Sequence, residues 1–300
     1  MEALVRLSFY CFAAGALAFA ASAVCYLAYA VGRVHLRQAT LQTSAGTTVV
    51  TTAAALEAGA PGVGRFGTLL AGFGVFFLGL AVALRSFAAG HLPLSNMYEF
   101  SLTFVFLIGL VYLIFERAYG VRQLGAIVLP IAVAMTIYIW TLPAGLREVD
   151  ALIPALQNRP LMTLHVSLAI LSYATFAVAF AAALLYLITS RRPLAWLPSA
   201  DLLDDLGYRA VTIGFPALAL VLILGSLWAH QAWGSYWSWD PKETAALFTW
   251  LIYGVYLHTR SLRGWRGNRS AAILILGFAA VVFTYFGNYV FGGLHAYGGV

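Results

Sequence analysis

The residues that most clearly suggest a binding function are tryptophans gathered in one short stretch. Four of the eight tryptophans, Trp228, Trp233, Trp237 and Trp239, fall between positions 228 and 239, with Tyr236 among them. An aromatic belt at a membrane interface would scatter Trp and Tyr over several loops. One concentrated group instead favours a flat apolar platform, which suits a large planar ligand.

The end of this stretch has the signature of a helix start. Asp240, Pro241 and Glu243 match the N-cap, first and third positions of a capping box with its favoured proline. A helix N-terminus also carries partial positive charge and free N–H groups, and Lys242 adds a cation. These residues either cap the next helix alone or also attract the carboxylates of a ligand on the tryptophans.

Two of the six histidines are predicted to lie level with the tryptophans. His165 opens the apolar segment 161–189, and His295 follows the segment 271–291 by four residues. Two neutral imidazoles can ligate one haem iron from opposite faces. Two unrelated interfacial histidines would give the same pattern, so the residues alone leave both interpretations open.

The remaining histidines have less distinctive settings. His258 lies roughly 22 Å along the helix that follows the tryptophan stretch. An ionisable residue within a membrane helix is a functional candidate, although His258 can equally snorkel beside Arg260. His230 ends an apolar segment and is interpreted as an interfacial polar residue rather than a third ligand. His91 is predicted to pack its own loop.

Membrane helices must position these residues. Hydrophobic residues make up 62% of the 300 residues and charged residues 9%, against roughly 25% charged in an average soluble domain. Runs of about 20 apolar residues cross a hydrocarbon core, where helices satisfy their own backbone groups. Eight such runs lie at 7–31, 67–87, 99–116, 123–140, 161–189, 211–230, 244–260 and 271–291. The predicted fold class is all-α, a polytopic membrane helical bundle of about eight transmembrane helices.

The distribution of cations predicts the orientation. Loops rich in Arg and Lys stay on the cytoplasmic side. The alternate loops 32–66, 117–122, 190–210 and 260–270 hold 12 of the 17 cations: Arg33, Arg37, Arg65, Arg117, Arg122, Arg191, Arg192, Arg209, Arg260, Arg263, Arg266 and Arg269. Both termini and the 231–243 loop are therefore predicted to face outward. This topology explains the net charge of +6 without nucleic-acid binding.

Several motifs resemble a family of haem-handling membrane proteins. The segment W-G-S-Y-W-S-W-D-P-K-E at 233–243 resembles the WWD signature of that group. Four further motifs are similar to its CcsA/ResC branch, in the system II cytochrome c biogenesis machinery: P-L-S-N-M-Y-E at 93–99, L-H-V-S-L-A-I-L-S-Y at 164–173, Y-L-H-T-R at 256–260 and G-L-H-A-Y-G at 293–298. The resemblance leaves mainly residues 1–66 without a matching motif.

The resemblance implies a role for individual residues. His165 and His295 are implied as the external axial ligands of haem iron. His258 is implied as one iron ligand of a transient transmembrane haem site. The implied haem cradle is the WWD loop, with Trp233, Gly234, Trp237, Trp239 and Asp240.

The implied function is transmembrane delivery of haem b, as a transported substrate, and its attachment to c-type apocytochromes at the outer membrane face. The apocytochrome presents a C-x-x-C-H segment whose cysteines are kept reduced by thiol-reducing proteins. A ResB-type (CcsB-type) membrane partner supplies the missing intramembrane histidine, so cytochrome c synthase (haem lyase) activity is expected only with that partner. The implied location is a bacterial cytoplasmic membrane or a thylakoid membrane.

The chain is expected to divide near residue 66. Residues 1–66 are predicted to form the first transmembrane helix and, over 32–66, a flexible cytoplasmic loop rich in Thr, Ala and Gly. Residues 67–300 are predicted to form the haem-handling membrane domain, with the WWD loop at 228–243. The outer segment 144–160 is predicted to lie along the interface as a short amphipathic helix.

Two other functional classes stay open. One is a haem exporter that hands haem to a chaperone, as CcmC-type WWD proteins do. The other is a b-type electron-transfer protein with bis-histidine haem inside the membrane. The flanking motifs favour the CcsA/ResC branch over the exporter, and histidines at helix ends favour exchangeable haem over buried haem.

Overall fold

The computed structural model describes residues 1–43, 50–191, 197–262 and 265–295. Its elements are α1 (Glu2–Thr43), α2 (Val50–Ala89), α3 (Met97–Tyr119), η1 (Arg122–Leu124), α4 (Gly125–Thr141), η2 (Ala144–Arg147), η3 (Pro154–Leu156), α5 (Arg159–Arg191), α6 (Ala200–Trp233), α7 (Pro241–Arg260) and α8 (Asn268–Phe291). The described ranges contain helices and no strand, which confirms the all-α prediction.

The long helices correspond one to one with the predicted apolar segments. Seven of them are long and apolar enough to cross a membrane. The remaining long helix, α7, has 20 residues and carries charged residues in its first and last turns. It packs against α8 and α6. The chain is therefore a multi-pass membrane protein.

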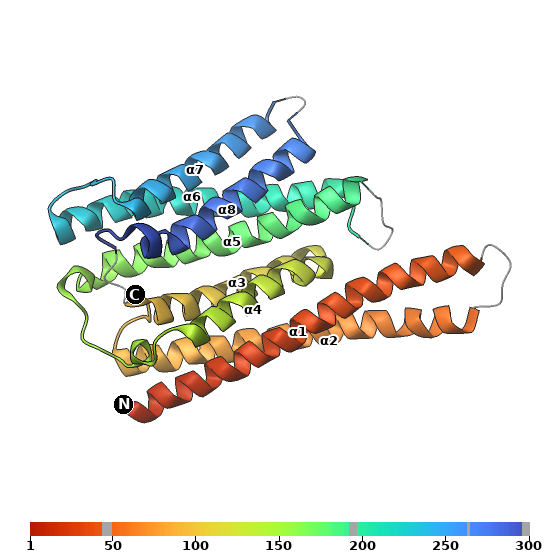
Figure 1. The fold of residues 1–300 in the computed structure, drawn as a ribbon, viewed down its shortest axis with the longest axis horizontal. Coiled ribbons are helices and arrows are strands. Elements are labelled where there is room, and N and C mark those ends of the chain that lie inside the picture. Colours follow the sequence, from red (N-terminus) through yellow and green to blue (C-terminus); the bar gives the residue numbers. More distant parts are fainter. Residues whose placement is uncertain (44–49, 192–196, 263–264, 296–300) are drawn as a thin grey trace.

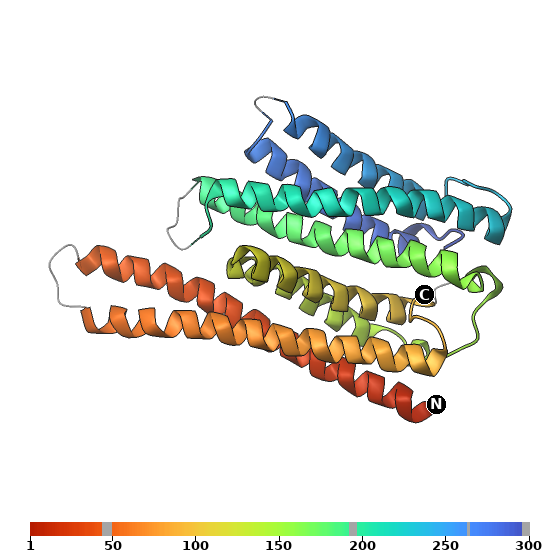
Figure 2. The same cartoon turned by 180° about the vertical axis from the view of Figure 1, so that it is seen from behind.

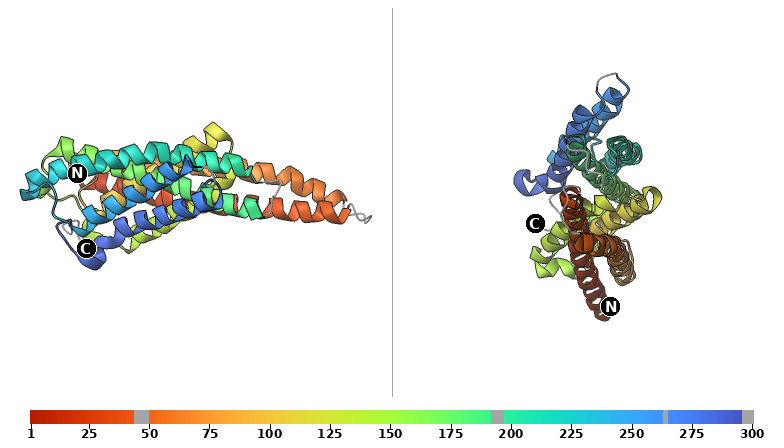
Figure 3. Two further views of the ribbon diagram at one scale, coloured as in Figure 1. Left: turned by 90° about the horizontal axis from the view of Figure 1, so that it is seen from above. Right: turned by 90° about the vertical axis from the view of Figure 1, so that its right-hand side faces the viewer.

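The helices form pairs that stack one after another. Figure 1 shows α1 and α2 at one edge, then α3 and α4, then α5 and α6, with α7 and α8 at the other edge. The end-on view in Figure 3 shows the same order. The pair α5 and α6 contacts its neighbours on both sides, through α3 and α8. Residues on α5 are therefore central in the molecule.

Chain ends and connections separate onto the two ends of the bundle. The N-terminus and the end of α8 lie at the same end as the α2–α3, α4–α5 and α6–α7 connections (Figure 1). The last turns of α1, α3, α5 and α7 lie at the opposite end. This is the alternation that the cation distribution predicts, so the end with the N-terminus corresponds to the predicted outer face.

The predicted flexible loop at 32–66 is wrong over the residues that the structure describes. The helix α1 continues to Thr43 and α2 begins at Val50, and the two project beyond the rest of the bundle (Figure 2). Residues 44–49 lie outside the described residues. Alanine is the strongest helix former, and the 50–60 stretch is alanine-rich, so composition alone underestimated its helical preference.

The predicted amphipathic helix at 144–160 is also wrong. This segment contains two short 3-10 helices, η2 and η3, joined by extended residues. Its backbone carbonyls are bound by Arg85, which is 1% exposed and donates to Leu146, Arg147 and Glu148. Since those carbonyls point at a fixed guanidinium, they are unavailable for a regular helix.

Candidate functional site

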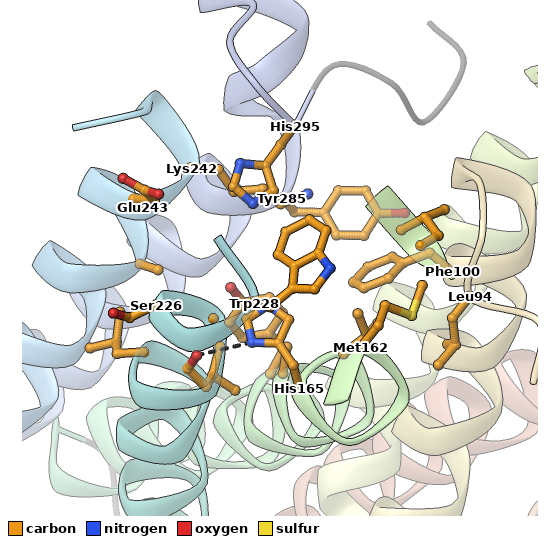
Figure 4. A pocket seen from close by; sticks show the side chains of 18 of the residues that line it. Leu94, Phe100, Met162, His165, Ser226, Trp228, Lys242, Glu243, Tyr285 and His295 are labelled. Atoms are coloured by element: carbon orange, nitrogen blue, oxygen red, sulfur yellow. Dashed lines mark hydrogen bonds between the residues drawn. The ribbon is translucent and has the colours of Figure 1, made fainter. Parts of the chain in front are cut away.

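A cavity of about 140 Å³ is lined by residues from α3, α5, α6 and α7 and from the segment after α8. The starts of α3, α5 and α7 and the end of α6 lie at the same end of the bundle as the N-terminus (Figure 1). His165 and His295 both face this cavity, together with Trp228 and Lys242 (Figure 4). Trp237 also lines it. The two predicted outer ligands, which are distant in the sequence, therefore meet at one site.

His295 is oriented by Asp240. Its Nδ1 lies 2.8 Å from Oδ2 of Asp240, a carboxylate that is only 5% exposed. The same carboxylate accepts hydrogen bonds from the backbone N–H groups of Lys242, at 3.1 Å, and Leu294, at 2.6 Å. Because Nδ1 donates to Asp240, Nε2 is the nitrogen through which His295 would bind a metal.

The turn before His295 depends on a glycine. Gly293 has a φ of 112°, in the region that favours glycine. A Cβ at this position would lie 2.3 Å from Oδ1 of Asp240. The close approach of this turn to α7 is what brings His295 to its carboxylate.

Burial and the contact between the two groups shift the pKa values of His295 and Asp240 in opposite directions. Burial lowers the pKa of His295 below its ordinary value of 6.5, although the hydrogen bond to Asp240 opposes that shift. Burial alone would raise the pKa of Asp240, but its hydrogen bonds to His295 and to backbone N–H groups bring it below the ordinary value. At neutral pH the pair is therefore a neutral imidazole beside a carboxylate.

His165 is oriented by the backbone of α6. Its Nδ1 lies 2.9 Å from the carbonyl oxygen of Val221, so Nε2 is again the nitrogen that would bind a metal. Gly225 makes this approach possible, since a Cβ there would lie 2.6 Å from Cε1 of His165. Both imidazoles therefore line the cavity with Nδ1 hydrogen-bonded.

Trp228 lies between the two imidazoles (Figure 4). Its ring centroid is 6.1 Å from that of His165, with an interplanar angle of 22°, and 5.7 Å from that of His295. The side chain is buried, and Nε1 donates to the carbonyl oxygen of Ala155 in η3 at 2.8 Å. The indole thus lies close to both candidate ligands.

The other tryptophans of the stretch do not form a single flat surface. Trp237 lines the cavity, whereas Trp233 packs edge-on against His295 at 4.9 Å. Trp239 is 70% exposed and makes an edge contact with Trp237 at 5.6 Å. Gly234 is the left-handed C-cap of α6, with a φ of 81°. The capping box that starts α7 at Asp240 is confirmed.

Comparison with known proteins decides the family. The family model described as "Cytochrome C assembly protein" matches residues 94–295, a range that contains every residue lining the cavity. The chain belongs to the cytochrome c assembly protein family.

Relatives of this family are similar over most of the chain. The chain is 38% identical over 239 residues to "Cytochrome c biogenesis protein CcsA" of Chlamydomonas reinhardtii, covering 77% of this chain and 67% of that protein. The CcsA proteins of Mesostigma viride and Synechococcus elongatus are 35% and 33% identical, covering 78% and 80% of this chain and 86% and 88% of those proteins.

A solved structure shares the fold. The structure of "Cytochrome c Heme Lyase CcmF" matches with a TM-score of 0.55 and 21% sequence identity, covering 91% of this chain. The chain spans 46% of the length of that protein. The likeness extends over α1 and α2, which precede the residues matched by the cytochrome c assembly family model.

The other predicted histidines do not join the cavity of this family member. His258 is exposed at the opposite end of α7. His230 is exposed and stacks on Tyr236 with a centroid distance of 4.1 Å. His91 has its Nδ1 2.8 Å from the carbonyl oxygen of Leu92. Within the described part of the chain, no group of three or more His, Cys, Asp or Glu side chains is placed to hold a bare metal ion.

Sequence reasoning missed several apolar residues of the site. Phe100, Met162 and Tyr285 form part of the cavity wall. Each lies inside or beside an apolar segment, where an aromatic or methionine side chain is indistinguishable from ordinary core. Only the motif around 93–99 pointed toward this wall.

Proposed function

We propose that this protein holds haem b as a substrate between His165 and His295 and delivers it for covalent attachment to c-type apocytochromes. The observation that carries the proposal is the pair of imidazoles lining one cavity, each oriented by a hydrogen bond at Nδ1. Neutral imidazoles are common axial ligands of haem iron. The relatives named for cytochrome c biogenesis support the reaction class.

The size of the cavity favours transient over permanent binding of haem. Its volume of about 140 Å³ is near the roughly 150 Å³ that admits benzene in an engineered protein cavity. A tetrapyrrole is several times larger than benzene, so the indole of Trp228 must shift before both imidazoles can reach one iron. A site that opens for its ligand also releases it, which suits a cargo that leaves with the apocytochrome.

Attachment needs positioning more than covalent catalysis by this chain. Each cysteine thiol of the C-x-x-C-H segment adds across one haem vinyl group, with sulfur bonding to one carbon and the proton going to the other. No electron is gained or lost, provided that thiol-reducing proteins keep both cysteines reduced. Orientation of two reactants can lower a barrier by about 7–11 kcal/mol. The histidine of the apocytochrome would replace one axial ligand and release the product.

His258 is proposed as one ligand of a separate transmembrane haem site. Its side chain is exposed on α7, where a second membrane protein can reach it. The second ligand would come from a ResB-type partner. Haem would enter near His258 and move along the bundle to the cavity.

The first test is the visible spectrum and haem content of the chain purified with its ResB-type partner. We expect His165→Ala and His295→Ala to abolish the bis-histidine spectrum of the outer site and added imidazole to restore it. His230→Ala is a matched control, because it removes an imidazole at the same end of the bundle that does not line the cavity. An unchanged spectrum in both ligand variants would show that the iron binds elsewhere.

A second test separates attachment from export. The chain and its ResB-type partner are produced in a host that lacks all other cytochrome c biogenesis genes, together with one apocytochrome. Thioether-linked cytochrome is the expected product. Haem that crosses the membrane without thioether formation would identify an exporter instead.

A further inference from the structure

Among the described residues that line the cavity, Lys242 is the one lysine or arginine. It is the only lysine in the sequence, where the other 16 cations are arginines. Its half-buried side chain lines the cavity beside His295 (Figure 4), and Nζ lies 5.9 Å from the ring centroid of Phe100. The ammonium group is therefore held against an aromatic wall of the site.

The nearby carboxylates are already occupied by other donors. Asp240 accepts from the backbone N–H groups of the α7 start and of Leu294, and from Nδ1 of His295. Glu243 accepts through Oε2 from Ser238 and from the N–H of Asp240. Among the described residues, no carboxylate lies within ion-pair distance of Lys242. A cation beside an apolar cavity without an anion partner is costly, so an anionic ligand would relieve that cost.

The start of α7 cannot bind an anion in place of the lysine. Pro241 has no backbone N–H, and the N–H groups of Lys242 and Glu243 both point to the side chain of Asp240. The capping box therefore uses the groups that would otherwise attract a carboxylate. At the start of α7, the ammonium of Lys242 is therefore the group that can bind a carboxylate of the ligand.

From these contacts we infer that Lys242 binds a propionate carboxylate of the tetrapyrrole held between His165 and His295. The inference rests on the proposed function and names the group that orients the substrate. An ammonium on a flexible stem binds a carboxylate as a compact point charge. Since propionates and vinyl groups lie on different edges of haem, an anchor at α7 turns the vinyl edge away from Lys242, where an apocytochrome can reach it.

The decisive experiment compares haem with haem dimethyl ester, in which both propionates are neutral. Their affinities are measured for the chain with its ResB-type partner, as wild type, Lys242→Met and Lys242→Arg. We expect the wild type to prefer haem by about tenfold. Lys242→Met should lose this preference while its affinity for the ester stays unchanged, and Lys242→Arg should retain most of it. Arg6→Met is the matched control, since Arg6 is an outer cation far from the cavity lining.

Carbodiimide coupling provides an independent readout. It joins a haem carboxylate to an amine, and Lys242 supplies the only side-chain amine in the chain. We expect a haem adduct on the peptide containing Lys242, and no adduct there with the dimethyl ester. Coupling only at the N-terminal amine would overturn the inference.

The possible failures are distinguishable. Lys242 is not the propionate anchor if Lys242→Met weakens the binding of haem and of its ester equally, or if it leaves the preference for haem intact. A preserved bis-histidine spectrum in that case still supports the proposed function. If the wild type gives no bis-histidine spectrum at all, the proposed function fails first, and the role of Lys242 fails with it.

Discussion

At the residue scale, Asp240 joins the start of α7 to His295. Asn is also a favoured N-cap, so Asp240→Asn keeps the cap but removes the charge that faces Nδ1 of His295. We expect haem affinity to fall about 10- to 100-fold, the usual effect of losing such an outer-shell partner. Haem titration measures the affinity, and thermal unfolding checks that the fold is kept. Unaltered haem affinity in the Asn variant would contradict the role given to this carboxylate.

The stability of the folded protein at acid pH depends on the pKa of His295, which burial holds below 6.5. The unfolded chain takes up the proton near pH 6.5, whereas the folded site resists it until a lower pH. The contribution of this group to stability is therefore complete above pH 6.5 and is lost as the pH falls toward the folded pKa. We expect the bis-histidine spectrum to persist below pH 6.5 in an acid titration. Its loss at or above that pH would contradict the lowered pKa.

A substitution at Gly225 tests how closely His165 must approach α6. Gly225→Ala places a Cβ 2.6 Å from Cε1 of His165, so the imidazole must move away from Val221. We expect haem binding to weaken markedly, with the loss visible in the axial-ligand bands of the spectrum. Gly72→Ala is the matched control, because a Cβ at Gly72 meets nothing within 4 Å. Equal spectra in the two variants would show that His165 tolerates the displacement.

At the element scale, the buried pair of Arg85 and Glu99 ties three elements together. Nε of Arg85 lies 2.7 Å from Oε1 of Glu99 at the start of α3, and the same guanidinium binds the η2 segment. Glu99 also accepts from Ser95 in the loop before α3, and Ser95 itself lines the cavity. This pair therefore supports one wall of the site from outside.

Removing one partner of this pair leaves a buried charge without its counterpart. We expect Arg85→Met to destabilise the fold by about 3–5 kcal/mol, and Arg85→Met with Glu99→Gln by less, because the double variant leaves no unpaired charge. Thermal unfolding of the wild type and the two variants compares these losses. A larger loss in the double variant than in Arg85→Met alone would contradict the coupling of the two side chains.

The elements were more predictable than their ends and their contacts. Each apolar segment became a helix, and the Asp240 capping box was recognisable because its spacing is local. The extensions of α1 and α2 were missed because a Thr- and Ala-rich segment has no periodic pattern. The meeting of His165 and His295 depends on helix packing, and the residues alone left it open. The position of Trp228 depends on its hydrogen bond to a carbonyl in η3, and no local sequence pattern predicts this contact.

At the scale of the whole molecule, the alternation of connections predicts which parts face each side of the membrane. Ser235 and Ser261 are exposed and lie at opposite ends of α7. In a variant without Cys11 and Cys25, we expect Ser235→Cys to react with a membrane-impermeant maleimide added outside intact cells. Ser261→Cys should react only after the cells are opened. The reverse pattern would invert the topology and move the proposed haem site to the cytoplasmic side.

The position of Trp228 also bears on trace metals. Two neutral imidazoles facing each other across a short gap ordinarily attract Zn²⁺ or Cu²⁺. The indole of Trp228 separates the imidazoles of His165 and His295, with centroid distances of 6.1 Å and 5.7 Å. A bare cation needs both nitrogens within about 2 Å and has no flat surface with which to displace an indole. An indole close to both imidazoles therefore disfavours a bare cation shared between His165 and His295.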